Sequence, residues 1–185
     1  AGGVRSAVHA TALEVAKAAV RAGADVLVHS VSDRPVDDEF VALMLENDVL
    51  YTSTLVVSEG YREVLNQEVE LNEAERRLGD REVIATWAHL DTIPHEEIPG
   101  GLRRRPAGPA RPVAYDNLKR LHDAGVRIVG ATDAGNIGTL HGPSLFREFE
   151  LMRDAGLDAM AILVSATRNA AAVMGNQDDA GTLEA

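Results

Sequence analysis

The sequence predicts an α/β fold in which parallel strands alternate with helices, and three features of the chain support this prediction. Four short apolar runs have the length and composition of buried strands. Segments with apolar residues at helical spacing lie between them. Glycines that can end a helix follow several of these segments. Because strand and helix alternate, we expect parallel strands joined by right-handed crossovers. The four strand candidates are residues 7–10, 25–30, 50–57 and 127–132.

The composition indicates a globular domain and argues against several classes of partner. A chain of 185 residues with 45% hydrophobic and 25% charged residues can bury one sizeable core, so we expect residues 1–185 to form a single domain. A net charge of −11 argues against a nucleic-acid partner, which binds basic surfaces. No apolar run approaches the roughly 20 residues of a membrane span, and no signal-like targeting segment is visible. Because the chain has no cysteine, a metal would need histidine or oxygen ligands.

The first strand–helix–strand unit occupies residues 7–30. Thr11 and Glu14 have the spacing of a capping box, which predicts that a helix starts there. Apolar residues at helical spacing continue toward Gly23, which can end the helix in a left-handed conformation. The following run is continuously apolar at its centre, as expected for a strand that is covered on both faces.

The alternation continues through a second helix and a third strand, and then it breaks. Residues 36–48 have helical spacing, and residues 50–57 are rich in β-branched side chains, which is typical of a strand. We predict an irregular and helical insertion over residues 58–112, where charged helical pieces precede a proline-rich stretch. The arginines at 103–105 could bind an anionic substrate, and a solvated loop cluster is the alternative.

The last part of the chain returns to regular alternation. We predict a helix over residues 115–124, a fourth strand at 127–132, a helix over 144–155, a helix capped by Asp158 and a short turn at 167–174. Four β/α units correspond to half of a (β/α)8 barrel, which typically needs about 250 residues, or to a small open sheet.

Three strand candidates end in residues that can bind a metal: His9, His29 and Asp133. In parallel α/β folds, functional residues collect at the carboxyl ends of the strands. Imidazoles and a carboxylate form an ordinary zinc ligand set, so these residues predict a metal site. Structural, hydrogen-bonded histidines are the alternative for His9 and His29. His141, after the last strand, is either a substrate contact or an exposed loop residue, and Tyr51 and Thr54 are candidates for lining the pocket. The remaining histidines are expected to be structural or solvent-facing: His89, His95 and His122.

Several motifs, taken in order, resemble one known family. They resemble the second half of the amidohydrolase superfamily barrel, in its imidazolonepropionase-like and prolidase-like branch. The resemblance covers nearly the whole chain except residues 58–112. It implies a partial (β/α)8 TIM barrel of about four β/α units, corresponding to strands five to eight. The motifs are Val8-His9-Ala10, Val28-His29-Ser30, Gly130-Ala131-Thr132-Asp133-Ala134-Gly135, Leu140-His141-Gly142 and Ala166-Thr167-Arg168-Asn169-Ala170.

The resemblance also implies an activity and roles for the site residues. The family implies a metal-dependent hydrolase of amide, peptide or cyclic amide bonds that uses one or two divalent metals, usually zinc. His9 and His29 would ligate one metal, and Asp133 would ligate the other and act as the proton shuttle. In single-metal members the strand-six histidine polarises the substrate, so His29 is also a catalytic candidate. A metal activates water near neutral pH, and a carboxylate can accept the proton that this water loses.

The chain lacks features that the family carries elsewhere. It has no His-x-His pair and no lysine on a predicted strand, since Lys17 and Lys119 both fall on predicted helices. The small β-domain that normally follows residues 181–184 is also missing. We therefore expect a C-terminal portion of an enzyme that is inactive alone, with a small-molecule amide or peptide as substrate. Its partner would be the missing N-terminal half of the barrel or a second copy of the chain. The alternative is a non-catalytic half-barrel, a structural or binding module with vestigial site residues.

Overall fold

Four parallel strands form one sheet, in the order β1-β2-β3-β4, in the computed structural model, which describes residues 4–89, 92 and 112–183. Each strand pairs with the next one along the chain, the usual arrangement for consecutive elements. The structure thus confirms the predicted α/β class with a parallel sheet. The strands are β1 (Ala7–His9), β2 (Val26–Val28), β3 (Leu50–Thr52) and β4 (Ile128–Val129).

Internal contacts divide the chain into two compact units. The first, which we call the sheet unit, comprises Ala1–Thr54, Pro112–Ala131 and Met152–Ala185 and contains all four strands. The second, which we call the helical unit, comprises Leu55–Arg111 and Thr132–Leu151. The expectation of a single domain over residues 1–185 stays a prediction.

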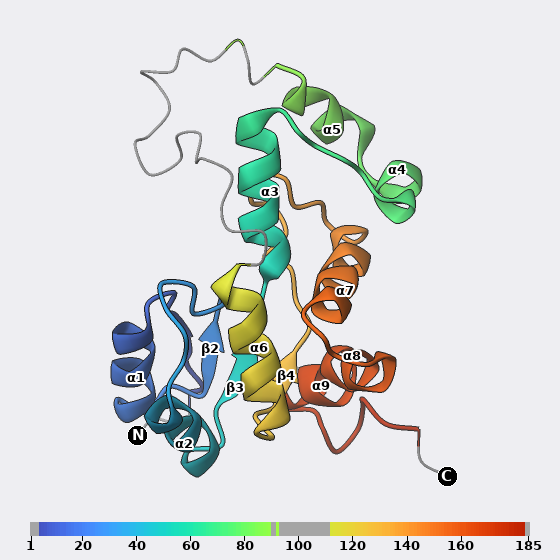
Figure 1. The fold of residues 1–185 in the computed structure, drawn as a ribbon. Coiled ribbons are helices and arrows are strands. Elements are labelled where there is room, and N and C mark those ends of the chain that lie inside the picture. Colours follow the sequence, from blue (N-terminus) through green and yellow to red (C-terminus); the bar gives the residue numbers. More distant parts are fainter. Residues whose placement is uncertain (1–3, 90–91, 93–111, 184–185) are drawn as a thin grey trace. The chain divides into compact units, whose positions relative to one another are not determined.

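The helices of the sheet unit bury an apolar core. They are α1 (Leu13–Arg21), α2 (Asp38–Glu46), α6 (Val113–Asp123), α8 (Ala159–Ala166) and α9 (Arg168–Met174). α1 contacts α2 and β2, whereas α8 and α9, drawn in red in Figure 1, contact each other and β4. Leu27, Phe40, Tyr51, Leu118 and Leu121 are fully buried in this unit. The continuous apolar runs seen in the sequence are therefore its interior.

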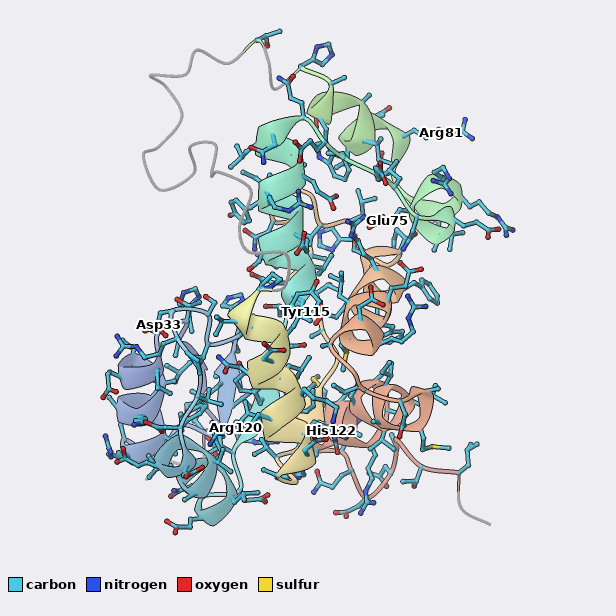
Figure 2. The ribbon with its side chains drawn as sticks, in the orientation of Figure 1. Asp33, Glu75, Arg81, Tyr115, Arg120 and His122 are labelled. Carbon is cyan, nitrogen blue, oxygen red and sulfur yellow. The ribbon has the colours of Figure 1, made fainter. Side chains whose placement is uncertain are left out.

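The start of α1 differs from the prediction. Its N-cap is Ala12, which makes no side-chain hydrogen bond, so the predicted capping box of Thr11 and Glu14 is wrong. The backbone N–H of Leu13 instead donates to Oδ1 of Asp33 at 2.9 Å. Asp33, labelled in Figure 2, thus caps this helix from a position 20 residues further along the chain.

The other predicted helices are present with small shifts at their ends. The segments expected at 36–48, 115–124 and 144–155 are α2, α6 and α7 (Ser144–Asp154). Asp158 caps α8 as predicted, accepting a hydrogen bond from the N–H of Ala161 at 2.8 Å. The short turn expected at 167–174 is the helix α9.

The third strand is shorter than predicted. We expected a strand over residues 50–57, but β3 ends at Thr52 and α3 (Leu55–Asn66) begins three residues later. The reason is a buried carboxylate: Glu148 accepts hydrogen bonds from the N–H groups of Leu55 at 3.1 Å and Val56 at 2.8 Å. These N–H groups are thereby satisfied at a helix N-terminus rather than in a sheet.

The described part of the predicted insertion is helical. α3, drawn in turquoise in Figure 1, is followed by α4 (Glu73–Leu78) and α5 (Arg81–Trp87), both drawn in green. Asn72 and Glu75 form a capping box at the start of α4. The arginines at 103–105 and His95 lie outside the described residues. Among the residues that the structure describes, no helix combines the length and apolar character needed to cross a membrane.

A cluster of charged and polar side chains is buried within the helical unit. Arg147 forms ion pairs with Glu63 and, at 3.5 Å, with Glu75. Glu75, labelled in Figure 2, also accepts a hydrogen bond from the hydroxyl of Ser144 at 2.9 Å. The Ser144 hydroxyl in turn accepts from the N–H of Leu140 at 2.9 Å. Each buried charge therefore has a partner, which limits the cost of removing it from water.

Candidate functional site

The structure brings His9 and His29 together at one edge of the sheet. His9 is the last residue of β1 and pairs in register with Val28, so His29 follows directly beyond the end of β2. Their ring centroids lie 4.5 Å apart with the ring planes at 69°. Because β1 and β2 run parallel, both histidines lie at the carboxyl ends of their strands, as the sequence predicted.

A hydrogen bond sets the orientation of the His29 ring. Nδ1 of His29 lies 2.7 Å from the hydroxyl oxygen of Thr54, which is buried. The backbone is unusual at both residues, with φ of +75° at His29 and +44° at Thr54, a region that non-glycine residues seldom adopt. Such strain persists where surrounding contacts fix it, and it is common at functional sites. The candidate roles of Tyr51 and Thr54 in lining a pocket stay predictions.

Buried hydrogen bonds hold the turn that carries His29. The hydroxyl of Tyr51 accepts from the N–H of Val31 at 2.7 Å, and the hydroxyl of Ser30 donates to the carbonyl of Ser53 at 2.9 Å. Burial raises the pKa of Tyr51 to about 12, so its hydroxyl stays neutral. The turn after β2 is thereby tied to the end of β3, next to Thr54.

Asp133 lies in the helical unit, on the loop that follows β4. It is exposed and has a positive φ of +51°. Nδ2 of Asn136 donates to Oδ2 of Asp133 at 2.6 Å, and Oδ1 of Asn136 accepts from the hydroxyl of Tyr61 at 2.8 Å. Neither Asn136 nor Tyr61 was singled out from the sequence. The Asp-x-x-Asn spacing, typical of side chains that hydrogen-bond locally in turns, could have indicated Asn136. Tyr61 is 75 residues from Asn136, and no local pattern could have indicated it.

His141 is exposed and lies beside the same loop. A Cβ placed on Gly135 would come within 3.3 Å of Nε2 of His141, so the ring lies against the turn that follows Asp133. Its role as a substrate contact stays a prediction. Of the other histidines, His89 is exposed on the residues after α5, and His122 is partly buried on α6.

The residues present fit part of a metal site. Two adjacent imidazoles are suitable ligands for zinc and similar divalent metals. Since Nδ1 of His29 contacts Thr54, a metal would be bound through Nε2, with Nδ1 donating its proton to the hydroxyl. Within residues 4–89, 92 and 112–183, no group of three or more histidine and carboxylate side chains is arranged to hold a metal. The assignment of His9 and His29 as metal ligands, and of Asp133 to the same centre, therefore stays a prediction.

Comparison with known proteins identifies the family. A family model described as the amidohydrolase family matches residues 8–185. The chain belongs to the amidohydrolase family. This confirms the resemblance found in the sequence, and solved structures that are prolidase-like members of the family support its branch. None of the curated proteins compared with this amidohydrolase chain matches it.

Solved structures of hydrolases share the fold of this amidohydrolase chain. One is a Xaa-Pro dipeptidase with bound methionine in its active site, 25% identical, with a TM-score of 0.61 over 99% of this chain and 37% of that one. A molinate hydrolase is 20% identical, with a TM-score of 0.60 over 98% of this chain and 35% of that one. A prolidase complexed with N-methylphosphonate-L-proline is 20% identical, with a TM-score of 0.58 over 96% and 35%. The chain therefore spans little more than a third of these proteins, which agrees with the predicted partial (β/α)8 barrel.

Proposed function

We propose that this chain is part of a metal-dependent amidohydrolase and carries two of its metal ligands, His9 and His29, and its proton shuttle, Asp133. The observation that carries the proposal is the contact between the two imidazoles, 4.5 Å apart at the carboxyl ends of adjacent strands. Membership of the amidohydrolase family supports it.

Each proposed ligand is supported by its surroundings. His9 is exposed at a strand end, where a metal can reach it, and the Thr54 contact fixes one ring orientation of His29. Hydrogen bonds of this kind hold the tautomer and direction of histidine ligands in metalloproteins. When bound, a divalent metal would supply an activated water and polarise the carbonyl group of the substrate.

Asp133 would move the proton in the reaction. Its exposed carboxylate can accept a proton as water attacks the scissile carbonyl and can then deliver this proton to the leaving amine. The second metal that the family resemblance assigns to Asp133 is part of this proposal. His141, on the same loop region, would contact the substrate.

The proposed substrate is an amide, a peptide or a cyclic amide. A dipeptidase that cleaves Xaa-Pro bonds is similar to this chain at 25% identity, and its structure holds a bound amino acid. Proline dipeptides are therefore the first substrates to test. Zinc is the proposed metal, since it accepts this ligand set, although manganese and iron accept it as well.

The described ligands do not complete a metal site, so we propose that the chain alone has little or no activity. Two histidines leave a tetrahedral metal short of protein ligands. The remaining ligands would come from the N-terminal half of the barrel or from a second copy of the chain. Vigorous hydrolysis of Xaa-Pro dipeptides by the chain alone, lost in Asp133→Ala, would contradict this.

Zinc content and affinity of the purified chain test the proposed metal site. We expect the wild-type chain to bind zinc above background and its affinity to fall at least about tenfold in His9→Ala and His29→Ala, because each removes a proposed ligand. His122→Ala, on α6, is the matched control and should bind zinc like the wild type. Equal zinc binding in all four proteins would refute the assignment.

A second candidate function follows from the incomplete ligand set. Because no group of three ligands is formed by the described residues, the chain could be a non-catalytic binding or structural module. In that case zinc would not bind above background, and adding the N-terminal half of the barrel would not restore binding or hydrolysis.

A further inference from the structure

A continuous chain of hydrogen bonds connects α3 with the carboxylate of Asp133. The hydroxyl of Tyr61 donates to Oδ1 of Asn136 at 2.8 Å, and Nδ2 of the same amide donates to Oδ2 of Asp133 at 2.6 Å. Nδ2 also lies 3.3 Å from the carbonyl oxygen of Asp133. The amide of Asn136 is therefore held at both ends, by a tyrosine on one side and by Asp133 on the other.

The backbone of α3 packs directly against the loop that carries Asn136. Gly60, which precedes Tyr61, lies so close to this loop that an added Cβ would come within 2.7 Å of the carbonyl oxygen of Ile137. A Cβ on Gly138 would come within 2.6 Å of the Cα of Gly60. Such distances are too short for any side chain, so two glycines allow the helix and the loop to touch.

The start of α3 is also fixed within the helical unit. The buried carboxylate of Glu148 accepts from the N–H groups of Leu55 and Val56, the first two residues of the helix. Inside the loop, the backbone carbonyl of Asn136 accepts from the N–H of Thr139 at 3.0 Å and from its hydroxyl at 2.8 Å. Both the helix and the loop are thus held independently of the Tyr61–Asn136 contact.

We propose that Asn136 and Tyr61 are positioning residues for the carboxylate of Asp133, which makes α3 part of the catalytic apparatus. The inference rests on the proposed role of Asp133 in proton transfer. Asp133 is exposed, and an exposed aspartate normally samples several side-chain rotamers. A donor fixed at Oδ2 selects one rotamer and so sets the direction of Oδ1, the oxygen that we assign to proton transfer.

This arrangement gives the predicted insertion a function. Residues 58–66, the last three-quarters of α3, begin the segment whose structure the sequence could not define. Their contacts with residues 136–138 bring the hydroxyl of Tyr61 into hydrogen-bonding contact with Asn136, which binds the carboxylate of Asp133. Well-oriented groups matter to catalysis because a proton must be transferred at hydrogen-bonding distance, and small displacements slow the step strongly.

The side-chain rotamer of Asp133, measured by NMR three-bond couplings on the full chain, tests the inference. We expect one dominant rotamer in the wild type and rotamer averaging in Asn136→Ala and Tyr61→Phe. Thr139→Val is the matched control, because it removes a hydrogen bond from the same loop without touching the carboxylate. It should keep the single rotamer. Tyr61→Phe removes only one oxygen atom, so it should remain folded even if Asn136→Ala does not.

The outcomes separate this inference from the proposed function. A single Asp133 rotamer retained in Tyr61→Phe and Asn136→Ala overturns the positioning role, whatever the chain binds. Averaging in Thr139→Val to the same degree also overturns it, since general loosening of the loop would then be the cause. Rotamer averaging only in the two positioning variants supports the inference. Zinc binding is scored separately, and its absence both in the chain alone and after adding the N-terminal half of the barrel would refute the proposed function while leaving the rotamer result readable.

Discussion

The sheet unit and the helical unit bury their interiors by different means. In the sheet unit, fully buried apolar side chains such as Leu27, Phe40 and Leu118 fill the space between strands and helices. In the helical unit, the buried set includes the carboxylates of Glu75 and Glu148, which bind backbone and hydroxyl groups. Apolar packing depends mainly on volume, whereas each hydrogen bond also depends on direction.

The two units therefore differ in how strictly their buried groups are oriented. Directional contacts fix individual groups, and the helical unit, where such contacts form much of the buried interior, carries Asp133, whose proposed role in proton transfer needs a defined orientation. The sheet unit also contains directional contacts, at His29 through the hydroxyl of Thr54 and at Val31 through the hydroxyl of Tyr51, but most of its buried side chains are apolar. We therefore expect substitutions of buried polar residues to act on local geometry and substitutions of buried apolar residues to act on stability.

The largest effect is expected from Phe40→Ala in the sheet unit. Phe40 is fully buried, and removing its ring should lower the free energy of unfolding by about 4 kcal/mol, because it loses apolar burial and leaves a cavity. Urea unfolding measures the change in the free energy of unfolding, and amide hydrogen exchange shows which elements lose protection. Loss in α1 and α2 with protection retained in α3 would show two separately stable units. Equal loss in both would show that they unfold as one.

Glu148→Ala should be the most damaging polar substitution in the helical unit. It leaves the N–H groups of Leu55 and Val56 without their acceptor, at a cost of about 3 kcal/mol. We expect faster amide exchange over the first turn of α3. Glu148→Gln, which keeps the size and one acceptor oxygen, should lose less. Unchanged protection at Leu55 in the alanine variant would show that this carboxylate does not anchor the helix.

Thr54→Val tests whether one directional contact matters within the sheet unit. The substitution keeps the shape of the side chain but removes the hydroxyl that contacts Nδ1 of His29. Since outer hydrogen bonds of metal ligands typically contribute tenfold or more, zinc affinity should fall by about tenfold. Isothermal titration measures it, with Thr52→Val on β3 as the matched control. Equal affinities in the two variants would remove Thr54 from the site.

The smallest expected effects concern how the free energy of unfolding depends on pH. Asp37 in the sheet unit and Glu63 in the helical unit should change it in opposite directions. In the sheet unit, a hydrogen bond from Lys17, with one from the N–H of Phe40, holds the pKa of Asp37 below its ordinary value. Its stabilisation is present above the unfolded pKa near 3.8 and is lost as the pH falls through the lower folded value. Asp37→Asn should therefore be less stable than the wild type at neutral pH, and the two should converge in acid.

In the helical unit, burial raises the pKa of Glu63 against the opposing charges of Arg147 and Arg62. The folded state thus holds this proton more tightly, and the stabilisation is present below the unfolded pKa near 4.5 and lost as the pH rises through the folded value. Glu63→Gln should match the wild type near pH 4 and exceed its stability at neutral pH. Unfolding curves recorded at both pH values test each sign, and a common sign for both variants would contradict the assignment.

The fold was predictable wherever local pattern determined it. Continuous apolar runs located the four strands, and Asp158 marked the start of α8 because its cap is local. The predictions failed where a distant group decided the outcome. Thr11 has the local signature of a cap, but Asp33 binds the N–H of Leu13, and the strand expected through residue 57 ends early because Glu148 caps α3.

The site was predictable to the same extent. Strand ends identified His9, His29 and Asp133 as candidates, and the structure brings the two histidines together. Contacts between residues that are remote in sequence could not be predicted, even where one partner, Thr54, was a candidate for lining the pocket. Thr54 lies 25 residues from His29, and Tyr61 lies 75 residues from Asn136.

The glycine contact between α3 and the Asp133 loop has a consequence for how this protein can vary. Gly60 and Gly138 permit each other's backbone to approach, so a side chain at either position already forces the two segments apart. Once this separation has occurred, a substitution at the other position has less left to disrupt, and the two effects should be less than additive. Sequence changes at these two positions should therefore be coupled during evolution. Once one glycine has been replaced, the other is no longer needed for close approach, and the hydrogen bonds that connect Tyr61 with Asp133 through Asn136 are lost as well.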